Sequence, residues 1–211
     1  MTLAQYRIER DGVDRLLFLM HGYTAEQHHL AAYVPLVDPS GRFTAIAPRG
    51  PLTMPDGDGA GWWSMDLDTF EPDLSGVEPS LTALASFVST EADKAEVPLE
   101  RCILGGFSQG GYLALALAGM PGGHRYGGVW AICCGVPNRL GLDVDLSKGD
   151  GRPVLFQWGT SDPVIGPDQP AEVVGVLEAG GWDLRHHAYE MAHSQTIEMM
   201  VDARDWLAGA L

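Results

Sequence analysis

A serine flanked by glycines is the clearest sign of chemistry in this sequence. Ser108 stands at the centre of a Gly-x-Ser-x-Gly pattern that Gly106 and Gly110 complete. An apolar run at 102–107 ends at the serine, and an Ala/Leu-rich run at 109–118 follows it. This order predicts the strand–turn–helix that exposes a nucleophilic hydroxyl in a sharp turn, where a Cβ on either flank would collide with neighbouring backbone. The alternative interpretation is a glycine-rich turn with an incidental serine.

A catalytic serine also needs a base and a carboxylate. Its hydroxyl is a weak nucleophile at neutral pH, so a histidine must take the proton and an acid must orient that histidine. Asp162 comes just after the apolar run 154–158, where parallel sheets place functional residues, whereas Asp168 lies deeper in the same loop. His193 follows the last expected strand, 184–189, and precedes a helical pattern. We therefore predict Asp162 as the orienting acid and His193 as the base.

Acyl transfer further needs donors for the oxyanion. The backbone N–H of Gln109, directly after the serine at a helix N-terminus, is the first expected donor. A second donor should come from a loop after an early strand, and His21, Gly22 and Tyr23 follow the apolar run 16–20. We assign this donor to the N–H of Tyr23, with His21 and Gly22 shaping the turn. An ordinary strand-ending turn is the alternative.

Short apolar runs alternate with helical patterns along the chain, which is typical of a mostly parallel sheet covered by helices on both faces. Strands are expected at 16–20, 43–47, 102–107, 128–133, 154–158 and 184–189, with an antiparallel edge strand at 6–9. Helices are expected at 27–37, 78–95, 109–118, 171–179 and 195–207. The sequence predicts a single α/β domain over residues 1–211.

Two irregular segments interrupt this alternation. Residues 48–76 are rich in Gly, Pro, Asp and Trp, and a loop of that length in a compact domain is usually functional. Residues 135–152 are too short to form a large cap. Apolar side chains near the expected site could bind substrate or merely cover the sheet edge. The candidates for substrate binding are Trp62, Trp63, Met65, Phe70, Val164 and Met191, with Tyr23 and Leu67 beside them.

Charge and cysteine content restrict the partners. The 211 residues include 13 Lys+Arg and 28 Asp+Glu, a net charge of −15. This charge argues against nucleic acid and stable membrane anchoring, and it favours neutral or cationic substrates over anionic ones. The cysteines, Cys102, Cys133 and Cys134, form no disulfide framework and are expected as buried apolar residues, so a cytoplasmic location is predicted. No spacing of Cys and His predicts a zinc site.

Several of these segments together carry a family resemblance. Residues 106–111 (Gly-Phe-Ser-Gln-Gly-Gly), 159–164 (Gly-Thr-Ser-Asp-Pro-Val), 192–194 and the pair His21-Gly22 resemble the carboxylesterase/phospholipase family of small α/β-hydrolases. The resemblance extends from about residue 15 to residue 207. It implies an α/β-hydrolase fold without a large cap, cleavage of carboxylic esters or thioesters, and no metal or cofactor. Ala192, at a position where a second glycine is common, departs from the family pattern.

The predicted function is a serine hydrolase that cleaves carboxylic esters of short to medium acyl chains through an acyl-enzyme on Ser108. An acyl-thioesterase or lysophospholipase of the same family is the first alternative. A non-catalytic ligand-binding protein on the same fold is the alternative from another class. A dienelactone hydrolase-like enzyme is disfavoured because it would carry Cys at position 108. The expected partner is a small-molecule ester or thioester. The sequence is compatible with a monomer or a homodimer.

Overall fold

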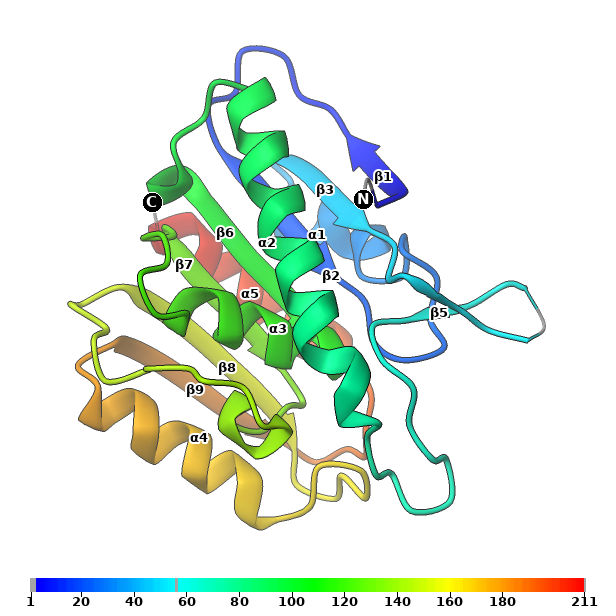
Figure 1. The fold of residues 1–211 in the computed structure, drawn as a ribbon. Coiled ribbons are helices and arrows are strands. Elements are labelled where there is room, and N and C mark those ends of the chain that lie inside the picture. Colours follow the sequence, from blue (N-terminus) through cyan, green and yellow to red (C-terminus); the bar gives the residue numbers. More distant parts are fainter. Residues whose placement is uncertain (1–2, 56, 211) are drawn as a thin grey trace.

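A seven-stranded sheet with helices on both faces forms the centre of the computed structural model, which describes residues 3–55 and 57–210 (Figure 1). The strand order is β1-β3-β2-β6-β7-β8-β9. Strand β1 is antiparallel to β3, and the other neighbouring strands are parallel. The strands are β1 (Gln5–Ile8), β2 (Leu16–Met20), β3 (Thr44–Pro48), β6 (Cys102–Phe107), β7 (Gly128–Ile132), β8 (Pro153–Gly159) and β9 (Asp183–Tyr189). The predicted α/β architecture with a mostly parallel sheet is confirmed.

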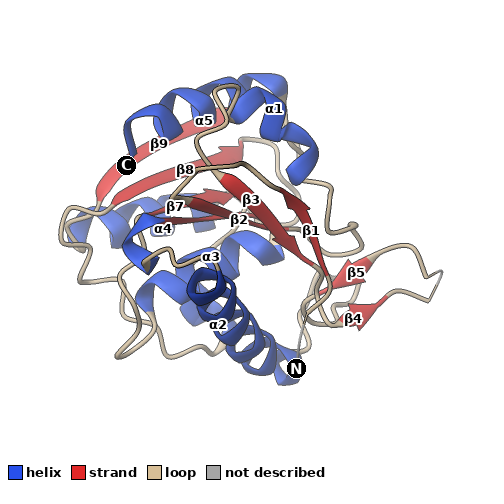
Figure 2. Cartoon of the chain, turned by 90° about the horizontal axis from the view of Figure 1, so that it is seen from above, coloured by secondary structure: helices blue, strands red, loops and turns tan. Residues whose placement is uncertain are grey.

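Helices cover the two faces of the sheet unequally. Helices α2 (Val77–Lys94), α3 (Gln109–Gly119) and α4 (Asp168–Ala179) pack on one face, and α1 (Val34–Val37) and α5 (Ile197–Ala210) pack on the other (Figure 2). Strand β2 alternates its side chains between the two cores. Because both faces are covered, the central strands are apolar throughout rather than alternating with polar residues.

The early helix predicted over residues 27–37 is wrong. The structure has a 3₁₀ turn at Ala31–Tyr33 followed by α1, which is a single turn with Pro35 at its start. Proline lacks an N–H and clashes with the preceding turn, so it is accepted at a helix start and not in a helix interior. The other predicted helices and strands are present, with ends shifted by a few residues.

The long loop after β3 contains a small hairpin that the sequence did not predict, formed by β4 (Leu52–Thr53) and β5 (Ala60–Gly61). The guanidinium of Arg49 donates to Gly59 O at 2.8 Å and to Gln27 Oε1 at 3.2 Å, which fixes the hairpin against the loop after β2. The chain then passes through Trp62 and Trp63 towards α2. In the described part of the chain, no helix has both the length and the apolar character needed to span a bilayer.

Candidate active site

Ser108 occupies a strained turn between β6 and α3. Its backbone has φ 54° and ψ −118°, a conformation that costs a residue with a side chain roughly 1–3 kcal/mol. A Cβ on Gly106 would lie 2.1 Å from Gly110 O, and one on Gly110 would lie 2.2 Å from Met20 O. The Ser108 N–H donates to Ile132 O at 2.9 Å on the neighbouring strand. The surrounding sheet therefore holds the serine at the carboxyl end of β6 in a conformation it would not choose alone.

Asp162 and His193 meet at the same edge of the sheet, after β8 and β9. His193 Nδ1 lies 2.7 Å from Asp162 Oδ2, and Oδ1 accepts backbone N–H groups of Val164 and Ile165 at 2.8 and 3.0 Å. Burial raises the pKa of Asp162, but the hydrogen bond from His193 and the two backbone donors outweigh it, so the pKa falls below its ordinary value. An ionised carboxylate only accepts, so Nδ1 carries the proton and Nε2 is left free to act as a base.

Ser108 and His193 lie beside one another. Both line a cavity of about 140 Å³, and the His193 ring lies 4.8 Å from the ring of Phe107, measured between centroids. Among the described residues the Ser108 hydroxyl makes no hydrogen bond. Such contacts are often long in unliganded enzymes and tighten when substrate binds. The shared cavity places the imidazole of His193 and the hydroxyl of Ser108 on the same surface.

The loop after β2 passes directly beside the serine. A Cβ on Gly22 would lie 2.9 Å from the Phe107 ring and 3.4 Å from Ser108 Cβ, so glycine permits this close approach. The next residue, Tyr23, lines the same cavity as Ser108. Gln109 begins α3, and the first N–H groups of a helix have no partner within it. Both residues predicted to supply oxyanion donors therefore flank Ser108.

His21 is a buried support for this loop. Its Nδ1–H donates to Gly22 O at 2.7 Å, and Nε2 accepts the Gly50 N–H at 2.9 Å. Burial lowers the pKa of His21 to about 4, which keeps the ring neutral and suits one donor and one acceptor. The ring stacks on Trp62 with centroids 5.4 Å apart. The sequence predicted that His21 shapes the turn but carried no signal for these partners.

The side chain of Gln109 anchors the loop that carries Trp62 and Trp63, here called the tryptophan loop. Its Oε1 accepts the Trp62 N–H at 2.9 Å, and its Nε2 donates to Trp63 O at 2.8 Å. Trp62 is 1% exposed, its indole donates to His21 O at 2.9 Å, and the Ser80 hydroxyl donates to its carbonyl. Trp62 thus lies beneath the site as a structural residue.

Two cavities meet at Ser108. The larger, of about 210 Å³, is lined by Trp63, Met65, Phe70, Pro72, Ser108, Gln109, Tyr112, Arg139, Leu140, Val164, Ile165 and Gln169. The smaller is lined by Tyr23, Thr24, Met65, Leu67, Phe70, Phe107, Ser108, Val164 and His193. Four of the six predicted substrate-binding residues, Trp63, Met65, Phe70 and Val164, line these cavities. Trp62 and Met191 line neither of them, and Arg139 and Tyr112 are lining residues that the sequence did not single out.

A buried thiol, that of Cys133, lies close to Asp162 and His193. One ligand atom each of Cys133, Asp162 and His193 lies within 4.8 Å of the others. Burial raises the pKa of the Cys133 thiol to about 12, so the thiolate that a metal requires is costly. His193 Nδ1 already faces the carboxylate. This chemistry favours a hydrogen-bonded acid–histidine pair with a buried thiol behind it over a cation site.

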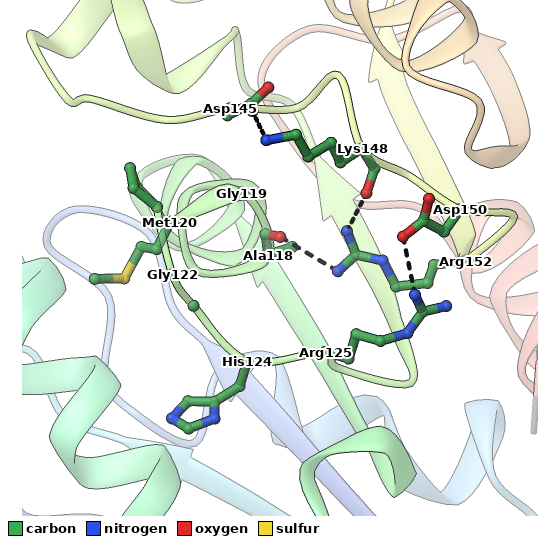
Figure 3. Close-up of a pocket in the computed structure, with 12 residues that line it drawn as sticks. Ala118, Gly119, Met120, Gly122, His124, Arg125, Asp145, Lys148, Asp150 and Arg152 are labelled. Atoms are coloured by element: carbon green, nitrogen blue, oxygen red, sulfur yellow. Dashed lines mark hydrogen bonds and ion pairs between the residues drawn. The ribbon is translucent and has the colours of Figure 1, made fainter.

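A further cavity lies at the opposite end of α3, away from the serine (Figure 3). Its cations are occupied: Arg125 pairs with Asp150 at 2.9 Å, and Lys148 pairs with Asp145 at 3.0 Å. Arg152 donates to backbone carbonyls, including Ala118 O at the end of α3, and lies over the Trp182 ring. The Arg152 contact with Ala118 O satisfies a carbonyl at the C-terminal end of α3.

Comparisons with known proteins agree with this fold. Residues 6–211 match the Phospholipase/Carboxylesterase family. Acyl-protein thioesterase 1 of Debaryomyces hansenii is 27% identical over 83% of this chain and 75% of its own length. Acyl-protein thioesterase 1 of Kluyveromyces lactis is 28% identical over 85% of this chain and 79% of its own length. Among solved structures, esterase PE8 superposes with a TM-score of 0.85 at 23% identity over 100% of both chains. The Bacillus cereus carboxylesterase superposes with a TM-score of 0.84 at 18% identity, over 99% of this chain and 95% of its own chain.

The fold and the residues at the carboxyl edge of its sheet define an α/β-hydrolase. The chain belongs to the phospholipase/carboxylesterase family, whose members hydrolyse esters and thioesters. The resemblance inferred from the motifs at Ser108, Asp162 and His193 is therefore confirmed at the level of the family.

Proposed function

We propose that this protein is a serine carboxylesterase that cleaves esters of short to medium acyl chains through Ser108, His193 and Asp162. The observation that carries the proposal is the 2.7 Å contact between Asp162 and His193, whose imidazole shares a cavity with a serine held in a strained turn. A purely structural serine would not need a backbone at φ 54°. Nor would it need flanking glycines at which a Cβ would lie 2.1 or 2.2 Å from a backbone oxygen.

In the proposed reaction, His193 Nε2 takes the Ser108 proton as Oγ attacks the ester carbonyl. Asp162 holds the imidazole and stabilises the imidazolium. The N–H groups of Tyr23 and Gln109 bind the oxyanion, and each such donor typically lowers the barrier by roughly 3 kcal/mol. The imidazolium then protonates the leaving alcohol. Water, activated by the same histidine, attacks the acyl-enzyme, releases the acid and restores the Ser108 hydroxyl.

The small size of the two cavities supports the preference for short to medium chains. They measure about 210 and 140 Å³, and Ser108 lines both. The same residues would also cleave a thioester, since only the leaving atom changes. That second activity is favoured by the relatives, which are named acyl-protein thioesterase 1.

Two assays test this function. A fluorophosphonate probe should label the wild-type protein and fail to label Ser108→Ala, because only an activated serine reacts. A panel of p-nitrophenyl esters and acyl-CoA thioesters of increasing chain length should give a maximum at short or medium esters. A folded protein that resists the probe and hydrolyses nothing in the panel would instead be a ligand-binding protein on this fold.

A further inference from the structure

The two cavities at Ser108 differ in their relation to the proposed base, and the following inference rests on the proposed function. His193 lines only the smaller cavity. The base that takes the serine proton must later deliver it to the leaving oxygen, so the leaving group departs on the side of His193. The smaller cavity therefore suits the alcohol, and the larger one, which borders Gln109 and extends to Tyr112 and Arg139, suits the acyl group.

One cation faces this larger cavity. Arg139 is the single charged residue among the described residues that line it, although the chain carries 28 acidic and 13 basic residues. It belongs to the 3₁₀ turn Pro137–Leu140, which follows β7. The lining of this cavity thus presents a cationic group although the net charge of the protein is −15, and the carboxylate paired with Arg139, that of Glu172, is not part of the lining.

The other polar groups on that wall already have partners. The Tyr112 hydroxyl donates to Gln169 Oε1 at 2.8 Å, and Gln169 Nε2 donates to Ile165 O. A Cβ on Gly135 would lie 2.1 Å from Gln169 Oε1, so a glycine there makes room for this pair. An acyl group entering the cavity therefore meets no unsatisfied polar group from Tyr112 or the Gln169 amide.

Arg139 keeps donors available. Its Nε donates to Glu172 Oε2 at 2.5 Å, and in the described parts of the chain its two terminal amino groups make no hydrogen bond. The planar guanidinium can bind a second carboxylate through those two groups while Nε stays with Glu172. The Arg139 side chain is half-exposed, so its carboxylate ligand need not be fully desolvated.

We propose that Arg139 binds a carboxylate at the far end of the acyl group, so that the enzyme prefers monoesters of dicarboxylic acids over neutral esters of similar length. The preference acts on the acyl side alone. It is moderate, about fivefold to tenfold in kcat/KM, because the ion pair forms at a partly solvated site.

Two isomeric substrates separate the acyl side from the alcohol side. Monomethyl glutarate carries its carboxylate on the acyl group, and 4-acetoxybutanoate carries the same carboxylate on the alcohol. Methyl hexanoate is the neutral reference with the methanol leaving group. Proton release at constant pH gives kcat/KM for each ester with the wild-type protein.

The variants are chosen to isolate the charge at position 139. Arg139→Met should lower the ratio of kcat/KM for monomethyl glutarate over methyl hexanoate by about tenfold, and Arg139→Lys should restore part of it. Glu172→Gln should raise the ratio, because it removes the competing carboxylate. Arg125→Met is the matched control: Arg125 forms a similar exposed ion pair, with Asp150, at the opposite end of α3, and the ratio should stay at the wild-type value (Figure 3).

Each outcome bears on one of the two proposals. The inference is overturned if wild-type protein prefers methyl hexanoate, if Arg139→Met leaves the ratio unchanged, or if the Arg139 effect appears with 4-acetoxybutanoate instead. In all three cases esters are still cleaved and Ser108 still reacts with fluorophosphonate, so the proposed function stands. Loss of all hydrolysis together with loss of labelling would remove the proposed function itself.

Discussion

The side-chain oxygen of Gln109 accepts the backbone N–H of Trp62 at 2.9 Å. Gln109 therefore serves the site in two ways. Its backbone begins α3 directly after the proposed nucleophile, and its side chain ties the loop after β5 to that helix end. Movement of the tryptophan loop would pull on the same residue that is proposed to bind the oxyanion.

Gln109→Ala should destabilise the protein by about 1–3 kcal/mol, because the buried Trp62 N–H and Trp63 O lose their partners. Ester hydrolysis should fall as well, since the loop borders the larger cavity. Urea unfolding and the p-nitrophenyl assay measure the two effects. Gln5→Ala is the control, because the hydrogen bonds of Gln5 on the edge strand are long, at 3.4 Å. Equal stability of the two variants would contradict the anchoring role.

Ser108→Gly should be inactive and more stable than Ser108→Ala by roughly 1–3 kcal/mol. Glycine adopts φ 54°, ψ −118° without the strain that a Cβ imposes, whereas alanine keeps that strain. Thermal or urea unfolding of both variants gives the difference. If glycine and alanine are equally stable, the serine turn stores no strain.

Asp162→Asn should reduce kcat by about 10³–10⁴-fold with the fold intact, because a neutral amide neither fixes the His193 tautomer nor stabilises the imidazolium. The pKa of Asp162 is lowered in the folded protein, so its ionised form stabilises folding above the ordinary carboxyl pKa. That contribution is lost as the pH falls through the lowered pKa. Stability measured against pH should therefore drop less steeply in acid for Asp162→Asn. A variant that retains more than a tenth of wild-type kcat would contradict the proposed role.

Asp162 is held in its ionised form, whereas His21 is a basic side chain that burial holds in its neutral form. Its folded pKa of about 4 lies below its ordinary value of 6.5, so the unfolded chain binds more protons between these two pH values. The free energy of unfolding should therefore decrease by roughly 3 kcal/mol as the pH falls across this window. Equilibrium unfolding from pH 7 to pH 4 measures the slope, which His21→Asn should flatten. The same change at His124, an exposed residue, should leave the slope as in the wild type.

The proposed catalytic residues could be located from sequence because each comes just after a strand. Ser108 follows β6, Asp162 follows β8 and His193 follows β9, and parallel strands bring their carboxyl ends to one edge. The same reasoning could not separate Trp62 from Trp63. They are adjacent in an irregular loop and both are buried. Only the structure shows that the Trp62 indole donates to His21 O whereas Trp63 lines the larger cavity.

Arg139 could not be recognised from the sequence as a residue of the site, for a related reason. Nothing in residues 135–152 shows that a short 3₁₀ turn brings this one cation to the cavity while Lys148 and Arg152 face the opposite end of α3. The net charge of −15 pointed to neutral or cationic substrates. It says nothing about the electric field inside a cavity in whose lining, as far as the structure describes the chain, Arg139 is the single charged residue.

The two tryptophans therefore make a paired prediction. Trp63→Leu should shift the preferred p-nitrophenyl ester towards longer acyl chains, because Trp63 lines the larger cavity and leucine leaves more room there. Trp62→Phe should lower the free energy of unfolding by about 1–3 kcal/mol through loss of the indole hydrogen bond to His21 O, with the chain-length preference unchanged. The ester series and urea unfolding, applied to both variants, separate the two roles. A shift in chain length for Trp62→Phe and none for Trp63→Leu would reverse the assignment of the residues.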